Sequence, residues 1–126
     1  MTPETHLAKA HRALESAELL LSDGDQDGAC NRAYYAMFDA AHAALLHTNA
    51  DLNPATIKTH RGLMAAFGET LVVTGRVAPE LGRALNQVER IRLLADYTGE
   101  PLTVEQTRWA INQARLFVDR IDTLVG

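Results

Sequence analysis

The stretch ACNRAYYAMFDAAHAALL, residues 29–46, constrains the fold more than any other part of this chain. It is a long apolar run interrupted only by Asn31, Arg32, Asp39 and His42. At 3.6 residues per turn, such a run predicts a helix that is buried on most of its sides.

A narrow polar seam follows this predicted helix. Arg32, Tyr35, Asp39 and His42 succeed one another at steps of three, four and three residues, so their side chains share one face. An unpaired buried charge costs several kcal/mol. We therefore expect Arg32 and Asp39 either to pair inside the fold or to face a partner.

The rest of the chain also reads as helix, without sustained two-residue alternation. Predicted helices cover roughly residues 3–21, 26–47, 55–73 and 79–97, and a fifth begins at the capping-box pattern Thr103–Gln106. Residues 48–54 form the longest connection. The sequence predicts an all-α, up-and-down bundle of five helices, with residues 1–126 in a single domain.

Composition narrows the function classes. The 126 residues are 47% apolar and 22% charged, as in soluble globular proteins, and no window approaches about 18 consecutive apolar residues. The N-terminus lacks a basic start followed by an apolar signal core. We expect a cytoplasmic protein with no membrane partner. Its single cysteine, Cys30, rules out an internal disulfide and is expected to pack as a small apolar side chain.

The net charge of −4 argues against coating nucleic acid through bulk positive charge, although a local basic groove remains compatible with it. Ten of the twelve basic residues are arginine, whose planar guanidinium suits bidentate phosphate contacts.

Three segments carry a family resemblance: NRAYYAMF at residues 31–38, KTHRGL at 58–63 and RLLADY at 92–97. Their order and spacing resemble the second, third and fourth helices of bacterial HEPN domains, over nearly the whole chain. The resemblance implies a helical bundle that forms a symmetric homodimer. It also implies a small nucleotidyltransferase as partner, as in two-gene toxin–antitoxin modules.

Active HEPN ribonucleases carry an R-x4-6-H motif near the end of the fourth helix. In the family, His and Arg of both chains surround a phosphate without a metal, and the RNA 2′-hydroxyl breaks the strand. Here no arginine is followed by histidine at that spacing, including Arg90 and Arg92. Asp96 is no substitute, because a carboxylate repels the phosphate and has a reference pKa near 4.

Two interpretations of the fourth-helix motif stay open. Arg92 and Asp96 form either an exposed i,i+4 pair or, with Tyr97 and the polar seam, a ligand-contacting patch. His60, flanked by Lys58 and Arg61, either meets phosphate or lies in a solvated basic helix start. The candidate ligand-binding residues are therefore Arg32, Tyr35, Asp39, His42, His60, Arg92, Asp96 and Tyr97.

No catalytic residue, cofactor or metal site is assigned from the sequence. His6, His11 and His47 have no obvious acidic partners at ligand spacing, and a metal site would need a further ligand from another helix. In some HEPN toxins the partner nucleotidyltransferase modifies a tyrosine that follows the catalytic histidine. Tyr97 follows Asp96 instead. The aromatic residues Tyr34, Tyr35, Phe38 and Trp109 are expected in the core or at a subunit interface.

These observations favour a nucleotide- or RNA-binding HEPN protein that acts with a small nucleotidyltransferase. The first alternative is a metal-independent ribonuclease toxin that uses Arg92 and a base such as His42 or His60. The second is a structural helical interaction module without a small ligand.

Overall fold

The computed structural model describes residues 1–49 and 52–126, which form α-helices and their connections without a strand. The elements are α1 (Pro3–Ser22), α2 (Gln26–Thr48), α3 (His60–Phe67), the π-helical turn η1 (Gly68–Val72), α4 (Pro79–Thr98) and α5 (Val104–Val125). The predicted all-α bundle of five helices is confirmed.

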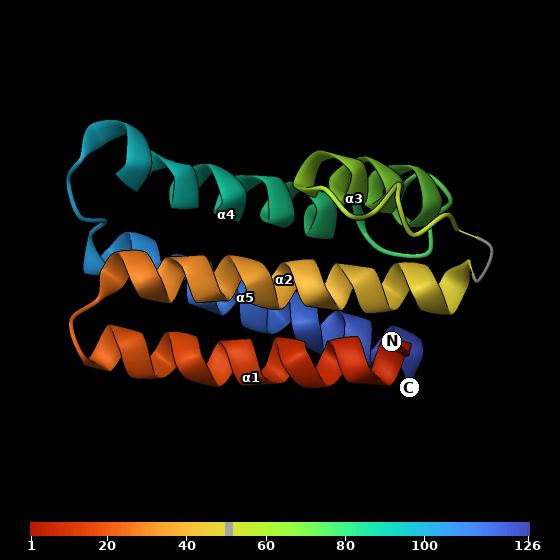
Figure 1. Ribbon diagram of the computed structural model, residues 1–126, viewed down its shortest axis with the longest axis horizontal. Coiled ribbons are helices and arrows are strands. Elements are labelled where there is room, and N and C mark those ends of the chain that lie inside the picture. Colours follow the sequence, from red (N-terminus) through yellow and green to blue (C-terminus); the bar gives the residue numbers. More distant parts are fainter. Residues whose placement is uncertain (50–51) are drawn as a thin grey trace.

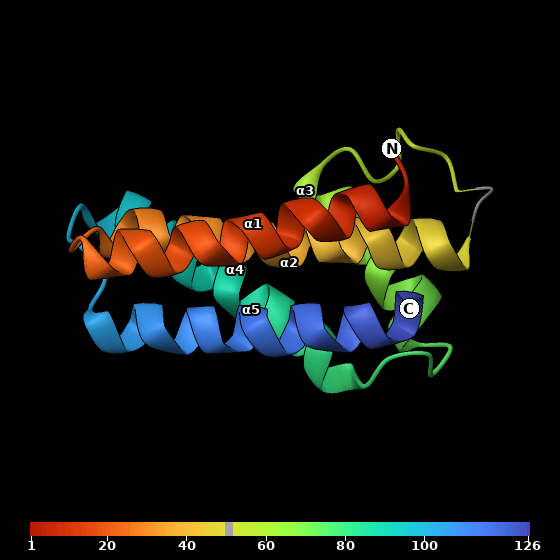
Figure 2. The same ribbon diagram turned by 90° about the horizontal axis from the view of Figure 1, so that it is seen from below.

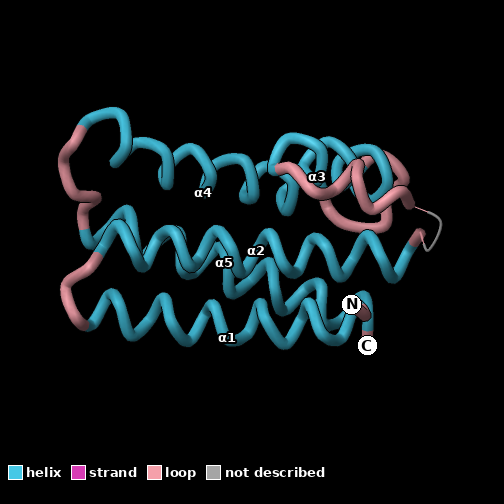
Figure 3. The backbone as a smooth tube through the Cα atoms, in the orientation of Figure 1, coloured by secondary structure: helices cyan, strands magenta, loops and turns pink. Residues whose placement is uncertain are grey.

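The long helices α1, α2, α4 and α5 run up and down along the molecule, and their connections gather at its two ends (Figures 1 and 3). The short α3 and η1 lie at one end. The α2 helix packs against each of the other four α-helices. This central position is what its alanine-rich sequence requires, since small side chains let neighbouring helices approach closely.

Local sequence signals fix where the helices begin. The Thr2 side chain accepts from Thr5 N at the start of α1, and Pro3 occupies the first turn. Asp25 caps α2 by accepting from Gly28 N at 2.9 Å. The predicted capping box of α5 is present, with Thr103 and Gln106 bonding each other's backbone N–H.

The third predicted helix begins later than expected. Residues 55–59 are not helical, because Asn53 turns the chain locally: its side chain accepts from Ala55 N at 3.0 Å and its carbonyl from Thr56 N at 2.9 Å. The α3 helix starts at His60 and passes into η1 at Gly68. Residues 50 and 51 of the predicted 48–54 connection lie outside the described residues.

The core is built around α2, twelve of whose residues are buried. Tyr34 and Met37 of α2 and Phe67 of α3 are among the largest fully buried side chains, as is Phe117 of α5, which packs against Phe67 with ring centroids 5.4 Å apart. The apolar faces of α2 are therefore covered within the chain, and its apolarity does not by itself demand a second copy.

Candidate functional site

Aromatic side chains of α2 meet His60, the first residue of α3. The Tyr34 hydroxyl lies 2.7 Å from His60 Nδ1, and the Tyr35 hydroxyl lies 3.5 Å from Nε2. The Phe38 ring is 4.9 Å from the imidazole, centroid to centroid. His60 is thus held by three aromatic rings, with its own side chain 41% exposed.

The start of α3 is shaped to deliver His60 to this position. The Thr59 side chain accepts from Gly62 N at 3.0 Å and caps the helix. A Cβ at position 62 would collide with the Thr56 carbonyl oxygen and lie 2.9 Å from Thr59 Oγ1. Only glycine lets the preceding turn approach the helix this closely, so the KTHRGL segment encodes the placement of His60.

Two charged residues of α4 complete the arrangement. The Arg92 guanidinium carbon lies 4.6 Å from the centroid of the Tyr34 ring and 5.9 Å from that of Tyr35. Glu89 Oε2 is 3.7 Å from Arg92 Nη2 and 3.9 Å from His60 Nδ1. We call Tyr34, Tyr35, Phe38, His60, Glu89 and Arg92 the Tyr–His–Arg cluster.

The cluster is partly buried and its polar groups are not all paired. Tyr34 is fully buried, whereas the side chains of Glu89 and Arg92 are 22% and 19% exposed. Within the described residues, Arg92 Nε and Glu89 Oε2 are buried without a hydrogen-bond partner. Burial, and then the nearby Glu89 carboxylate, raise the pKa of the Tyr34 hydroxyl, so it stays a neutral hydrogen-bonding group.

A groove opens beside two residues of the cluster, His60 and Glu89. It has a volume of about 530 Å³ and runs between α3 and α4 beside His60 and Glu89, with Arg61 on its wall. The imidazole of His60 and the Arg61 guanidinium border the groove, and the partly exposed Arg92, Tyr35 and Phe38 lie next to His60, a set of side chains whose chemistry suits a phosphate attached to a planar base.

The comparison with known families agrees with the helical architecture. The HEPN domain model matches residues 3–124 of the chain. The chain belongs to the HEPN family.

Relatives of this HEPN protein come from bacteria and archaea. The chain is 38% identical over 112 residues to a Methanocaldococcus jannaschii protein named "Putative toxin MJ0605", covering 89% of this chain and 80% of that one. UPF0332 protein glr0978 of Gloeobacter violaceus is 38% identical over 101 residues, 79% of this chain and 76% of the relative. A UPF0332 protein of Thermotoga maritima is 35% identical over 120 residues, 93% and 86% of the two chains.

The predicted polar seam of the HEPN chain divides between two neighbourhoods. Tyr35 joins the Tyr–His–Arg cluster, and the Arg32 guanidinium lies 5.9 Å from the Tyr35 ring. Asp39 turns toward α1, where Lys9 Nζ is 4.0 Å from its Oδ1. Arg32 and Asp39 therefore have different neighbours, and burial raises the pKa of Asp39 while Lys9 and then Arg32 oppose the shift.

His42 also faces α1. Its imidazole stacks on His6 with centroids 4.8 Å apart, and Phe38 meets its other side at 5.1 Å. Phe38 thus contacts both His42 and His60 and links the two halves of the seam. The two histidines considered as bases lie in different places. His60 lies beside Tyr34 and Tyr35, the aromatic residues next to Arg92, whereas His42 lies on the side of α2 that faces α1.

The remaining candidates, Asp96 and Tyr97, lie apart from the cluster. Both are exposed at the end of α4, with Tyr97 87% exposed. In the described part of the chain Arg92 takes Glu89 as its ion-pair neighbour and does not take Asp96. Helical side chains lean toward the N-terminus, so Arg92 reaches back over Tyr34 toward Glu89.

Sequence reasoning missed Glu89 and underrated Tyr34, which was expected only to pack. A signal existed for Glu89, since residues three apart on a helix lie on one face and Glu89 precedes Arg92 by three. His6 had no signal, because its partner His42 lies 36 positions away.

Three further findings concern metal binding, the cysteine and membrane-spanning helices. Across residues 1–49 and 52–126, no three His, Cys, Asp or Glu side chains converge so as to hold a metal. Cys30 is buried, which raises its pKa to about 11 and keeps it a thiol, as its predicted packing role requires. None of the described helices has the length and apolarity needed to cross a bilayer.

Proposed function

We propose that this HEPN protein binds RNA or a nucleotide at the Tyr–His–Arg cluster and acts with a small nucleotidyltransferase in a toxin–antitoxin type module. The observation that carries the binding proposal is the convergence of Arg92 and His60 on the Tyr34 ring, from two different helices.

The chemistry of the cluster supports a phosphate-bearing ligand. The Arg92 side chain is 19% exposed, and an arginine fork can give two parallel hydrogen bonds to phosphate oxygens. Tyr35 and Phe38 are half-buried, so part of each ring is available for stacking with a base. The negative charge of the Glu89 carboxylate repels a phosphate and therefore lowers the affinity for a phosphate-bearing ligand.

A pair of arginine variants tests the binding site. Fluorescence anisotropy with a labelled single-stranded RNA of mixed sequence is measured for Arg92→Ala and for Arg90→Ala, the matched control on the exposed side of α4. We expect Arg92→Ala to weaken binding at least tenfold and Arg90→Ala to leave it within twofold. Melting temperatures separate lost binding from lost folding. Equal affinities in the two variants would refute the site.

The toxin–antitoxin context draws on the HEPN family and on the relative that carries the word toxin in its name. A nucleotidyltransferase gene adjacent to the gene of this chain is the expected finding, whereas growth arrest on expression of this chain alone would favour the ribonuclease alternative. The homodimer that belongs to this proposal rests on the family resemblance, and a monomer by light scattering at micromolar concentration would remove it.

Tyr97 is the proposed target of such a nucleotidyltransferase. Its exposed fraction of 87% at the end of α4 makes the hydroxyl accessible to a partner enzyme. Intact mass spectrometry after incubation with ATP and the transferase should show an added nucleotide in the wild type and none in Tyr97→Phe. An unchanged wild-type mass would contradict the assignment.

A second candidate function is metal-independent RNA cleavage, favoured by the same convergence of His60 and Arg92 on Tyr34. When Nδ1 of His60 donates its proton to the Tyr34 oxygen, the lone pair of Nε2 can take the proton of the RNA 2′-hydroxyl in place of the contact with the Tyr35 hydroxyl, which lies 3.5 Å away. Arg92 would stabilise the negative charge that develops on the phosphate. Cleavage of labelled total RNA in EDTA that is lost in His60→Asn and Arg92→Ala, but kept in His42→Asn, is the expected signature. Binding without cleavage would leave the protein a binding module.

A further inference from the structure

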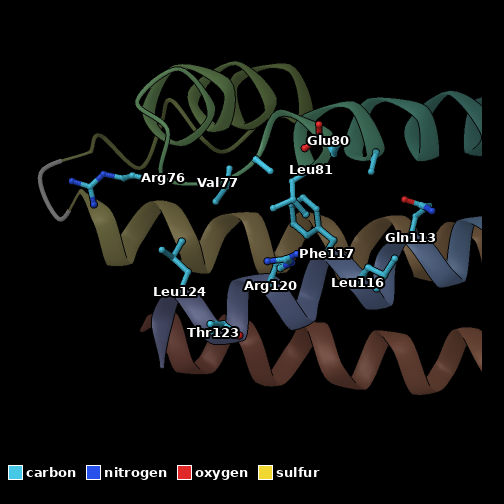
Figure 4. Close-up of a pocket in the computed structure, with 12 residues that line it drawn as sticks. Arg76, Val77, Glu80, Leu81, Gln113, Leu116, Phe117, Arg120, Thr123 and Leu124 are labelled. Atoms are coloured by element: carbon cyan, nitrogen blue, oxygen red, sulfur yellow. The ribbon is translucent and has the colours of Figure 1, made fainter.

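A second groove lies on the other side of α4, away from the Tyr–His–Arg cluster. Its volume is about 470 Å³, and it is formed by the chain entering α4, the first turns of α4 and the C-terminal half of α5. In Figure 2, α4 crosses α5 at an angle, and the start of α4 lies just beyond α5. Figure 4 shows the residues that line this groove.

The groove combines an apolar floor with positive charge. Leu81, Leu116 and Leu124 supply apolar surface that is exposed at least in part, above the buried Val77 and Phe117. Arg76 lies at one end, and Arg120 lies beside Phe117 (Figure 4). Apolar surface that is open to water favours a partner that covers it.

The two arginines are available to a partner. Both are exposed, and neither forms an ion pair with any residue that the structure describes. The acidic residue of the groove, Glu80, is already engaged, because its Oε1 is 2.9 Å from Arg83 Nη2. The groove is therefore locally cationic in a chain whose net charge is −4.

We propose that this groove docks an amphipathic helix of a protein partner, with leucine-like side chains on the floor and carboxylates facing Arg76 and Arg120. Helices that bind in grooves present apolar anchors at i, i+3 or i+4 and i+7, and a groove between two crossing helices accepts such a stripe. The proposal is independent of RNA or nucleotide binding at the cluster.

The test compares two labelled peptides with the same leucine stripe, one with glutamates and one with lysines at the remaining positions. The chain's net negative charge alone favours the lysine peptide. The groove predicts the reverse, with the glutamate peptide binding at least tenfold more tightly by fluorescence anisotropy and shifting backbone NMR signals of Val77, Leu81 and Phe117.

Charge-reversal variants locate the contact. Arg120→Glu should weaken binding of the glutamate peptide at least tenfold, whereas Arg12→Glu, an exposed arginine of α1 without an ion pair among the described residues, should change it less than twofold. Equal binding of the two peptides, shifts confined to another surface or no binding at 1 mM peptide would each overturn the proposal. RNA binding by Arg120→Glu is measured in parallel and should equal that of the wild type.

Discussion

His6 and His42 stack face to face between α1 and α2, with ring planes 9° from parallel and centroids 4.8 Å apart. The Nδ1 atoms of both rings are buried without a hydrogen-bond partner in the described structure. Such a pair is compatible with two neutral imidazoles and unfavourable for two positive ones. The contact therefore ties the packing of α1 on α2 to pH.

Replacing His6 should flatten the pH dependence of stability. Burial, followed by His42, Lys9 and the N-terminus, lowers the pKa of His6 from 6.5 to about 4. Because the unfolded chain binds the proton more readily, the free energy of unfolding falls as pH drops from about 6.5 toward 4. Urea unfolding across this range should show a smaller fall in His6→Phe. His47→Asn, at the exposed end of α2, serves as the control, and slopes equal to wild type in both variants would contradict the prediction.

Two glycines of the third-helix region should respond to alanine in opposite directions. Gly62→Ala places a methyl group against the Thr56 carbonyl and should destabilise the fold by about 1–3 kcal/mol. Gly68 is helical, with φ −60°, and a Cβ there meets nothing within 4 Å. Gly68→Ala should stabilise by about 0.5–1 kcal/mol, because alanine restricts the unfolded chain. Chemical denaturation measures both, and effects of the same sign would disprove the local geometry.

Removing the Glu89 charge should strengthen anion binding. Its carboxylate lies 3.7 Å from Arg92 Nη2 and competes with any phosphate for that guanidinium. We expect Glu89→Gln to bind the RNA oligonucleotide about threefold to tenfold more tightly, a gain of about 0.7–1.4 kcal/mol. Glu80→Gln, on the exposed first turn of α4, should bind like the wild type. Weaker binding by Glu89→Gln would mean that the carboxylate positions Arg92.

Tyr34→Phe should loosen His60 while keeping the aromatic core. The change deletes the hydroxyl that lies 2.7 Å from Nδ1, and one hydrogen bond is worth about 0.5–1.5 kcal/mol. A lower melting temperature is expected, together with changed ¹⁵N shifts of the His60 ring. Tyr35→Phe, whose hydroxyl is 3.5 Å from Nε2, should have the smaller effect. An unaltered His60 spectrum in Tyr34→Phe would show that the contact does not fix the ring.

Helix positions were largely predictable because periodicity and caps are local properties. The Thr103–Gln106 capping box and the prolines at the start of α1 and α4 act within one helical turn. The predicted start of α3 was wrong by five residues. Asn53 first turns the chain, and Thr59 then caps the helix, so α3 begins only after Thr59.

The candidate site was less predictable. The spacing predicts that Arg32, Tyr35, Asp39 and His42 share one side of α2, but one side of a helix can contact two neighbouring helices. Tyr35 meets α3 and α4, whereas Asp39 and His42 meet α1. His60, Tyr34 and Arg92 come together through the packing of α3, α2 and α4. No local sequence pattern encodes that packing.

Seven of the twelve buried residues of α2 are alanine. A helix enclosed through methyl groups leaves little free volume for larger side chains at those positions, so Ala→Leu replacements there would force its neighbours apart. Larger side chains are consequently best tolerated at the partly exposed positions of α2, such as Arg32, Tyr35, Phe38 and His42. The alanines of α2 thus set the distance between this helix and those packed around it.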